Sequence, residues 1–174
     1  LQDRNTLLKR EADTSEMDVF EKMLAEKSAL LRSIRSSEIV ELDRLFKRIY
    51  SIISPKEEFP EIAYKPDTEA FVPDDFVQLF KKNRGRDRLL KSTQHGPHRD
   101  ELNIRLQSRI ARDFASEGQQ RSTIISLKIA QLQYLHKVCG VLPVLLADDV
   151  LGELDLERNA NFWKAVGETV QVIA

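Results

Sequence analysis

Apolar residues in the first third of the chain recur with the period of an α-helix. From Ser15 to Ile53 they return every three or four positions, and Glu, Lys and Arg fill most of the positions between them. This spacing predicts one long amphipathic helix whose apolar stripe packs on the protein's own core, and Pro55 ends the pattern. A coiled coil would need a cleaner heptad repeat. The predicted stripe consists of Phe20, Met23, Leu24, Leu30, Leu31, Ile34, Leu42, Leu45, Phe46, Ile49, Ile52 and Ile53.

Four prolines between residues 55 and 73 predict a linker, with a short strand at Glu61–Lys65 inside it. A short helix is expected near Asp74–Lys82, where Phe76, Leu79 and Phe80 recur on one side. We therefore place the linker within a helical region that extends to residue 90.

A basic stretch follows this short helix. It contains Asp87 and six cationic residues, which are Lys81, Lys82, Arg84, Arg86, Arg88 and Lys91. Such a run is most often a solvated surface, and the functional alternative is contact with the phosphate backbone of a nucleic acid. The segment Gly85–Ser92 looks like a phosphate-binding loop, but Leu90 stands where that loop needs a glycine to curl around phosphates. A phosphate-binding loop is therefore rejected here.

The hydrophobic period changes to two after Gly96-Pro97. Leu102, Ile104 and Leu106 alternate with polar residues, which predicts a half-buried strand. A second short strand is expected at Ile110–Phe114.

The remaining pattern is typical of an α/β domain. Ser116 is a good N-cap with Gln119 three residues later, as in a capping box, and Gly140 is a natural C-terminal stop for this helix. The apolar run Val141–Ala147 predicts a strand buried on both faces. A further helix capped by Asp155 and a last strand at 170–174 complete the alternation that parallel sheets show.

Composition narrows the class of protein. The formal net charge of the 174 residues is −1, so any affinity for nucleic acid must come from a local patch or a partner. Cys139 is the single cysteine and cannot form an internal disulfide. No apolar run reaches the roughly 18 residues of a membrane span, and no signal-peptide pattern is present. Because the chain starts with Leu1 and stops inside a predicted strand, we expect a cytoplasmic segment of a longer protein.

Two local features could carry chemistry. Asp148 and Asp149 follow the buried strand, at the edge where open α/β sheets place ligands, and their mutual repulsion favours a cation such as Mg²⁺ on a nucleotide. The alternative is that the two acids simply open a loop. At Ser116–Ser122, a helix start with a hydroxyl and a flexible glycine could hold an anion, although plain capping is the simpler interpretation.

The order of the motifs resembles a known family. Ser116–Ser122 (SEGQQRS) looks like the signature motif of ABC-type ATPases, Val144–Asp149 (VLLADD) like their Walker B strand, and Gly152–Asp155 (GELD) like their D-loop. With Gly96–Asp100 (GPHRD) and the opening Leu1–Asn5, the set resembles the RecF family of DNA-repair ATPases. The resemblance spans nearly the whole chain.

The resemblance implies an α/β fold, namely a partial ABC-type P-loop NTPase head with a mainly helical second lobe. Residues 1–90 would form the helical lobe, and residues 91–174 the C-terminal half of the head (lobe I). The family's Walker A motif has no match among these 174 residues. We therefore expect them alone to bind ATP poorly and to hydrolyse essentially none.

The family also implies roles for the acids. Asp148 would hold Mg²⁺, directly or through water. Asp149 stands where most ABC ATPases have Glu, and it would orient or deprotonate the attacking water. Gly152 and Asp155 belong to the D-loop, in which Asp155 would couple two ATP sites and Gly152 replaces the usual Ser.

The signature motif would act in trans. Ser116, Gly118, Gln119 and, less strongly, Arg121 would reach across a dimer to the γ-phosphate of ATP held by the other subunit. Glu117 replaces the more usual Gln and adds negative charge near that phosphate.

The implied function is ATP-dependent DNA binding in recombinational repair and replication maintenance, including the response to DNA damage (SOS response). ATP and Mg²⁺ are the expected cofactors. The expected partners are single-stranded or gapped DNA, recombination mediator proteins and a second copy of the protein, joined through ATP; no membrane is expected. The full-length protein would be a weak DNA-dependent ATPase, with DNA contacts from 81–91 and the helical arm. A non-enzymatic scaffold with an ABC-like lobe, or another SMC-like ATPase head, is the alternative.

Overall fold

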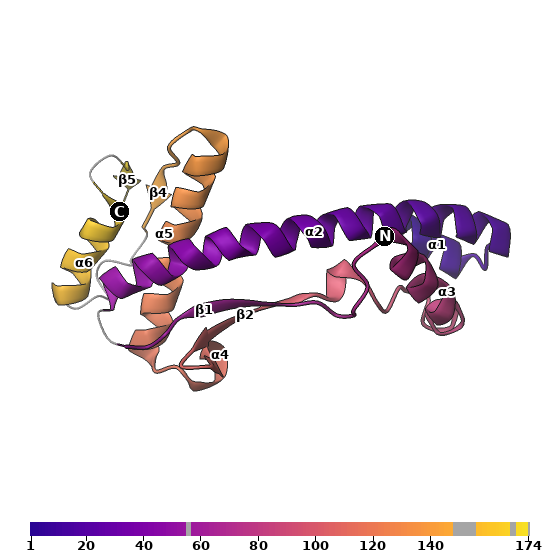
Figure 1. Ribbon diagram of the computed structural model, residues 1–174, viewed down its shortest axis with the longest axis horizontal. Coiled ribbons are helices and arrows are strands. Elements are labelled where there is room, and N and C mark those ends of the chain that lie inside the picture. The colour runs from indigo at the N-terminus through magenta and orange to yellow at the C-terminus, as the bar shows by residue number, and fades with distance from the viewer. Residues whose placement is uncertain (55–56, 148–155, 168–169, 174) are drawn as a thin grey trace. The chain divides into compact units, whose positions relative to one another are not determined.

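The computed structural model describes residues 1–54, 57–147, 156–167 and 170–173 (Figure 1). Its elements are α1 Gln2–Lys9, α2 Thr14–Ile53, β1 Glu61–Lys65, α3 Pro73–Leu90, the 3₁₀ turn η1 Pro97–Arg99, β2 Glu101–Leu106, β3 Arg109–Ile110, α4 Ala111–Phe114, α5 Glu117–Cys139, β4 Leu145–Leu146, α6 Leu156–Val166 and β5 Val172–Ile173. The strands form one sheet of order β1-β2-β3 and one parallel pair, β4-β5.

The chain forms two compact units, each built from separate stretches of sequence. Residues 1–38 and 64–102 make unit 1, and residues 39–63 and 103–174 make unit 2. The predicted lobes, residues 1–90 and 91–174, are a different division of the chain and stay a prediction. Helix α2 and strands β1 and β2 each contribute residues to both units, so no single position along the sequence separates them.

Helix α2 confirms the predicted long helix but buries an unexpected face in unit 1. Met23, Leu30 and Ile34 are 60%, 55% and 48% exposed, although all three belong to the predicted stripe. The single apolar stripe is therefore wrong for the unit 1 half. There the buried face is selected by ionic partners on other segments. The buried residues of this half are mostly small or charged: Met17, Glu21, Ala25, Ser28, Ala29 and Arg32.

Arg4 of α1 is the centre of unit 1. Its guanidinium is 1% exposed and donates to Glu21 of α2 at 2.8 Å and to Asp87 of α3 at 2.7 Å. It also donates to Thr93 Oγ1 at 2.7 Å and lies 5.1 Å from the ring centroid of Phe80. Figure 1 shows α1 and α3 beside the unit 1 half of α2. A buried cation with two carboxylate partners thus joins the three helices of this unit.

Asp100 is a second buried ionic centre, and it ends the GPHRD segment. Its side chain is 1% exposed and accepts from Arg32 of α2 at 2.5 Å, from the Tyr64 hydroxyl, and from the backbone N–H of Asp67 at 2.8 Å. Burial raises the pKa of this carboxyl, but the hydrogen bonds from Arg32, Tyr64 and Asp67 outweigh that effect and lower it overall. The end of this segment is therefore fixed to α2.

Helix α3 extends to Leu90, eight residues beyond its predicted end. The basic stretch therefore lies within this helix, not after it. Gly85 is inside the helix, and the helix ends at Lys91, which adopts the left-handed conformation (φ 51°). A regular helix across Gly85–Leu90 confirms that this segment is no phosphate-binding loop.

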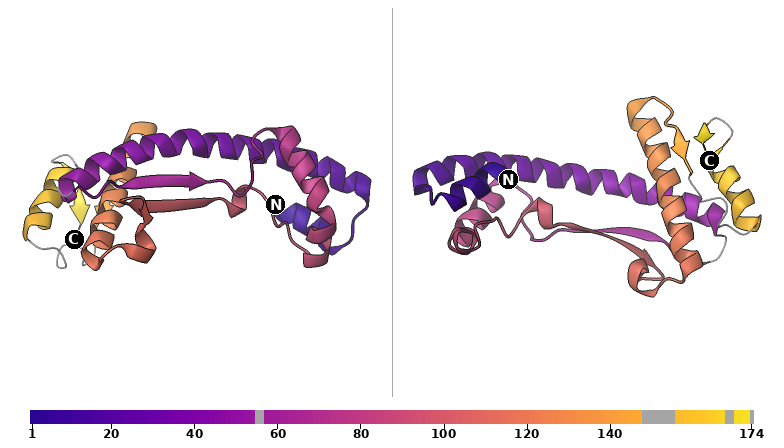
Figure 2. Two further views of the ribbon diagram at one scale, coloured as in Figure 1. Left: turned by 60° about the horizontal axis from the view of Figure 1, so that its bottom comes forward. Right: turned by 180° about the vertical axis from the view of Figure 1, so that it is seen from behind.

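Unit 2 has the larger apolar core. Phe46, Ile49 and Tyr50 of α2 pack with Ile129 of α5 and Phe162 of α6. Helix α5 runs across this part of α2, with α6 beside it (Figure 2). In this unit the predicted stripe of α2 is buried as expected.

Two short segments of unit 2 differ from their predictions. The expected strand at Ile110–Phe114 ends at Ile110, and a one-turn helix, α4, follows at once. Strands β2 and β3 form a hairpin whose turn residues, Gln107 and Ser108, both have positive φ (48° and 65°). This is the conformation of a two-residue hairpin turn, which matches the twist of the flanking strands.

The predicted buried strand at 141–147 is shorter and more exposed than expected. Only Leu145 and Leu146 are extended as β4, and Leu146 is 72% exposed. They pair in parallel with Val172 and Ile173 of β5, so the parallel arrangement is confirmed. Burial on both faces is wrong, because the Leu146 side chain is largely exposed. Within the described residues β4 also has a single neighbouring strand.

Removing the buried cation of unit 1 tests the importance of its ionic core. Arg4→Ala leaves Glu21 and Asp87 without this buried partner, so we expect a loss of about 3–5 kcal/mol in the free energy of unfolding. Urea denaturation measures this loss. Arg10→Ala is the control, because Arg10 is 56% exposed and pairs with Glu16 at the surface, where a loss below about 1 kcal/mol is expected. Equal losses for the two variants would contradict the account.

Candidate functional site

The start of α5 is a fully formed capping box. The Ser116 hydroxyl accepts from the backbone N–H of Gln119 at 3.3 Å, and the Gln119 side-chain oxygen accepts from the backbone N–H of Ser116 at 2.8 Å. These reciprocal bonds confirm the predicted cap and fix where the helix begins. Gly140 ends the helix in the left-handed conformation (φ 69°), also as predicted. The signature-like residues therefore stand at a rigid helix N-terminus.

A buried carboxylate holds the other end of the Gln119 side chain. Glu58 is 7% exposed, and its Oε1 accepts from Gln119 Nε2 at 3.0 Å. Its Oε2 accepts from the Tyr50 hydroxyl at 2.5 Å and from Ser54 Oγ at 3.2 Å, both near the end of α2. Burial and the hydrogen bond to Glu58 raise the pKa of Tyr50, so its hydroxyl keeps its proton and remains a donor. Glu58 was not expected from the sequence, because it lies in the predicted linker.

Gly118 is in close contact with an arginine from α6. A Cβ at this position would lie 2.8 Å from Arg158 Nη1, so only glycine admits the guanidinium there without a shift. Arg158 is partly buried and places a positive charge beside the first turn of α5. Sequence reasoning missed this residue as well. Arg158 could have been suspected from its position, because it lies in the first turn of the helix that follows the D-loop-like motif.

Arg121 is engaged within its own helix. Its Nη2 lies 2.6 Å from Oε1 of Glu117, one turn earlier, and the Glu117 side chain is 80% exposed. The negative charge that Glu117 adds near the predicted phosphate position is therefore partly balanced by its neighbour.

The predicted acids lie outside the described residues. Asp148, Asp149, Gly152 and Asp155 fall in the stretch 148–155, so their predicted roles stay predictions. The residue before them, Ala147, is buried, and its N–H donates to the backbone oxygen of Ile173 at 2.8 Å. Across the described ranges, no three His, Cys, Asp or Glu side chains gather as a metal site would require.

The basic stretch of α3 divides into internal and exposed members. Arg84 pairs with Asp18 at 2.6 Å and with Glu21, while Arg88 donates to the backbone oxygen of Ala12 at 2.8 Å. These two arginines therefore have structural contacts that were not predicted. Lys81 lies 3.8 Å from Asp18 and stays half exposed. The exposed remainder, which forms no ion pair with described residues, consists of Lys82, Arg86 and Lys91.

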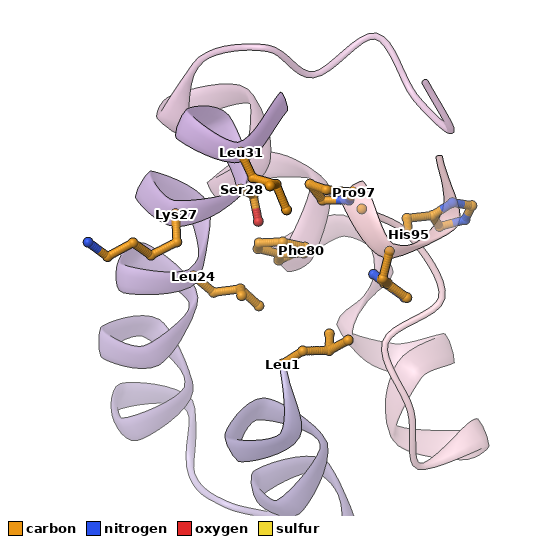
Figure 3. Close-up of a pocket in the computed structure, with 10 residues that line it drawn as sticks. Leu1, Leu24, Lys27, Ser28, Leu31, Phe80, His95 and Pro97 are labelled. Atoms are coloured by element: carbon orange, nitrogen blue, oxygen red, sulfur yellow. The ribbon is translucent and has the colours of Figure 1, made fainter. Parts of the chain in front are cut away.

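Unit 1 also contains a small apolar pocket of about 130 Å³. Figure 3 shows the side chains of Leu1, Leu24, Leu31, Phe80 and Pro97 around it. The two histidines of its lining are engaged, since His95 Nδ1 lies 3.0 Å from Asp67 Oδ2 and His98 Nε2 lies 3.1 Å from the backbone oxygen of Thr93. Convergent polar groups of the kind that orient a small substrate are therefore lacking among its described lining residues.

The chain is similar to known proteins along nearly its whole length. It is 36% identical to the DNA replication and repair protein RecF of Lactobacillus gasseri, over 92% of this chain and 46% of that protein. The identity to RecF of Geobacter metallireducens is also 36%, over 97% of this chain and 47% of that protein. The chain belongs to the RecF family. No family model matches it.

Solved RecF structures share the fold. The structure of the recombination mediator protein RecF-ATP in the RecFOR pathway superposes with a TM-score of 0.85 at 30% identity, over 99% of this chain and 48% of that one. The corresponding RecF-ATPrS structure gives 0.84 at 29% identity, with the same coverage. This confirms the predicted family and fold class, an α/β fold that is a partial ABC-type head with a mainly helical second lobe. The chain spans about half the length of the RecF proteins that it matches.

In the part of this RecF-family chain that the structure describes, no helix combines the length and hydrophobicity that crossing a membrane requires.

Proposed function

We propose that these residues are the signature-motif and Walker B half of a RecF-type protein, which binds DNA under the control of ATP during recombinational repair and replication. ATP held by one copy is contacted by α5 of a second copy, so that ATP joins two heads. The closed dimer holds single-stranded or gapped DNA, and slow hydrolysis releases it. Recombination mediator proteins are the proposed further partners.

The capped start of α5 is the observation that carries this proposal. Ser116, Gly118 and Gln119 lie at the N-terminus of a helix of 23 residues, where the helix dipole and the backbone N–H groups favour an anion. The guanidinium of Arg158 adds positive charge at the same place. The similarity of this chain to the RecF-ATP structure supports a nucleotide phosphate as that anion.

The acids supply the proposed chemistry at the end of β4. Asp148 would hold Mg²⁺, and the ion would supply positive charge beside the transferring phosphoryl group when ATP is bound. Asp149 orients the attacking water or accepts its proton. The phosphate cradle is proposed to lie in the half of RecF proteins that this chain does not span. The Glu117–Arg121 pair weakens the repulsion that Glu117 alone would exert on the phosphate.

The exposed part of the basic stretch is the proposed DNA contact within unit 1. Lys82 and Arg86 stand one turn apart on α3, and Lys91 ends the same helix. Three exposed cations on one helix suit a phosphate backbone, which binds by charge and by counterion release.

Neutralising these cations tests the DNA contact. In full-length RecF carrying these residues, Lys82→Gln, Arg86→Gln and Lys91→Gln together should reduce the slope of log K against log salt concentration by about two to three. Filter binding or fluorescence anisotropy on gapped DNA measures this slope. The control replaces three exposed lysines on other helices, Lys128, Lys137 and Lys164, with Gln, which should leave the slope unchanged. An unchanged slope in the first variant would remove the patch from the DNA site.

Asp149→Asn tests the proposed ATPase. In the full-length protein the change removes the group that activates water but keeps its size, so the turnover number should fall about 100-fold or more, while ATP binding persists. Phosphate release and nucleotide titration measure the two quantities. Asp113→Asn, a change of an exposed acid on α4, is the control and should leave both unchanged. A protein that binds no ATP in its native form would favour the scaffold alternative.

A further inference from the structure

The buried carboxylate of Glu58 lies between two parts of unit 2 that the family motifs do not connect. It comes from the segment after α2, outside every motif singled out in the sequence. Its two oxygens are shared between α5, through Gln119, and the end of α2, through Tyr50 and Ser54. A carboxylate that is 7% exposed remains favourable only when its oxygens are hydrogen-bonded in this way.

Glu58 determines which way the Gln119 amide points. Oε2 of Glu58 accepts from Tyr50 and Ser54, and Oε1 accepts from Gln119 Nε2 at 3.0 Å, so the NH₂ end of Gln119 faces the carboxyl group. The amide oxygen of Gln119 is then left to face the backbone N–H of Ser116, at the observed 2.8 Å. A flipped amide would bring two donors together at Ser116 and oppose oxygen to carboxylate at Glu58. The capping box and the Glu58 contact therefore support the same orientation.

The anchoring of Glu58 makes this orientation rigid. The Tyr50 side chain is buried at 1% exposure in the core of unit 2, so its hydroxyl is a fixed donor. The backbone oxygen of Glu58 also accepts from the N–H of Gln107 in the β2–β3 turn, at 2.9 Å. Side chain and backbone of Glu58 are thus both held, and neither needs to reorganise when a ligand arrives.

We propose that Glu58 is a positioning residue for the trans nucleotide site: it sets the Gln119 side chain and the first turn of α5 before the ATP of a second copy is engaged. This inference rests on the proposed function of α5. Glu58 itself contacts no phosphate. A donor geometry that is set in advance reduces the conformational entropy lost on binding. Glu58 should therefore lower the ATP concentration at which two heads join.

The test is a double-mutant cycle in full-length RecF carrying these residues. Glu58→Gln replaces the obligate acceptor with an amide that can turn either way, so half-maximal self-association should need about 3–10 times more ATP, with an unchanged turnover number at saturation. Light scattering and phosphate release measure these quantities. Glu57→Gln makes the same chemical change at the neighbouring exposed position and should have no effect.

Exchanging the two groups separates positioning from packing. Gln119→Glu places two carboxylates together and should lower the urea midpoint in the absence of nucleotide. In E58Q/Q119E an amide again donates to a carboxylate, with the two groups exchanged, so that midpoint should recover. No recovery, or an unchanged ATP requirement in Glu58→Gln, would overturn the inference. If the native protein shows no ATP-dependent association, the proposed function fails instead, and the urea cycle still decides whether Glu58 and Gln119 are coupled.

Discussion

Buried charges, and the partners that burial obliges them to have, organise both units of this chain. A charged group removed from water is tolerated only when ionic partners and hydrogen bonds replace its hydration. Arg4 and Asp100 meet this requirement in unit 1, and Glu58 meets it in unit 2. In each case the partners come from segments far apart in sequence, so satisfying one charge fixes several segments at once.

Two irregular segments are therefore bonded to helices through buried side chains. The segment 91–100, which contains GPHRD, is tied to α1 through Thr93 and to α2 through Asp100. The segment that follows α2 is tied to the start of α5 through Glu58. The signature-like residues therefore owe their geometry to a local capping box and to a distant buried carboxylate together. This makes the start of α5 a preformed surface, suited to meeting a ligand presented by another molecule.

Local features of the fold could be predicted from the sequence. Strand β2 and the two ends of α5 follow from alternation, capping and glycine chemistry, all of which act within a few residues. The buried face of α2 in unit 1 could not be predicted, because the partners of Glu21 and Arg32 lie on other segments of the chain. Glu21 pairs with Arg4 of α1 and Arg84 of α3, and Arg32 pairs with Asp100. The two discontinuous units escaped prediction for the same reason. Helix α3 was predicted too short because its apolar repeat ends at Phe80. Its second half is held instead by polar contacts of Arg84, Asp87 and Arg88.

At the start of α5, too, the sequence predicted local features but not contacts between distant segments. The order of the motifs was enough to predict the RecF family, and the capping box was predicted correctly from Ser116 and Gln119. Glu58 and Arg158 were missed, because only the folded chain brings them to the first turn of α5. Two arginines of α3 that looked like surface cations have their partners on α2 and at Ala12.

The central claim is that the start of α5 contacts a nucleotide phosphate held by a second copy, and Ser116→Asp in the full-length protein tests it most directly. Aspartate is as good an N-cap as serine, so α5 should keep its stability, while the added negative charge repels the phosphate. Sedimentation of the native and Ser116→Asp proteins with Mg²⁺ and ATP is the measurement. The account predicts that the native protein forms a dimer, whereas the variant binds ATP and remains a monomer. Dimerisation of the Ser116→Asp variant at the same ATP concentration as the native protein would contradict it.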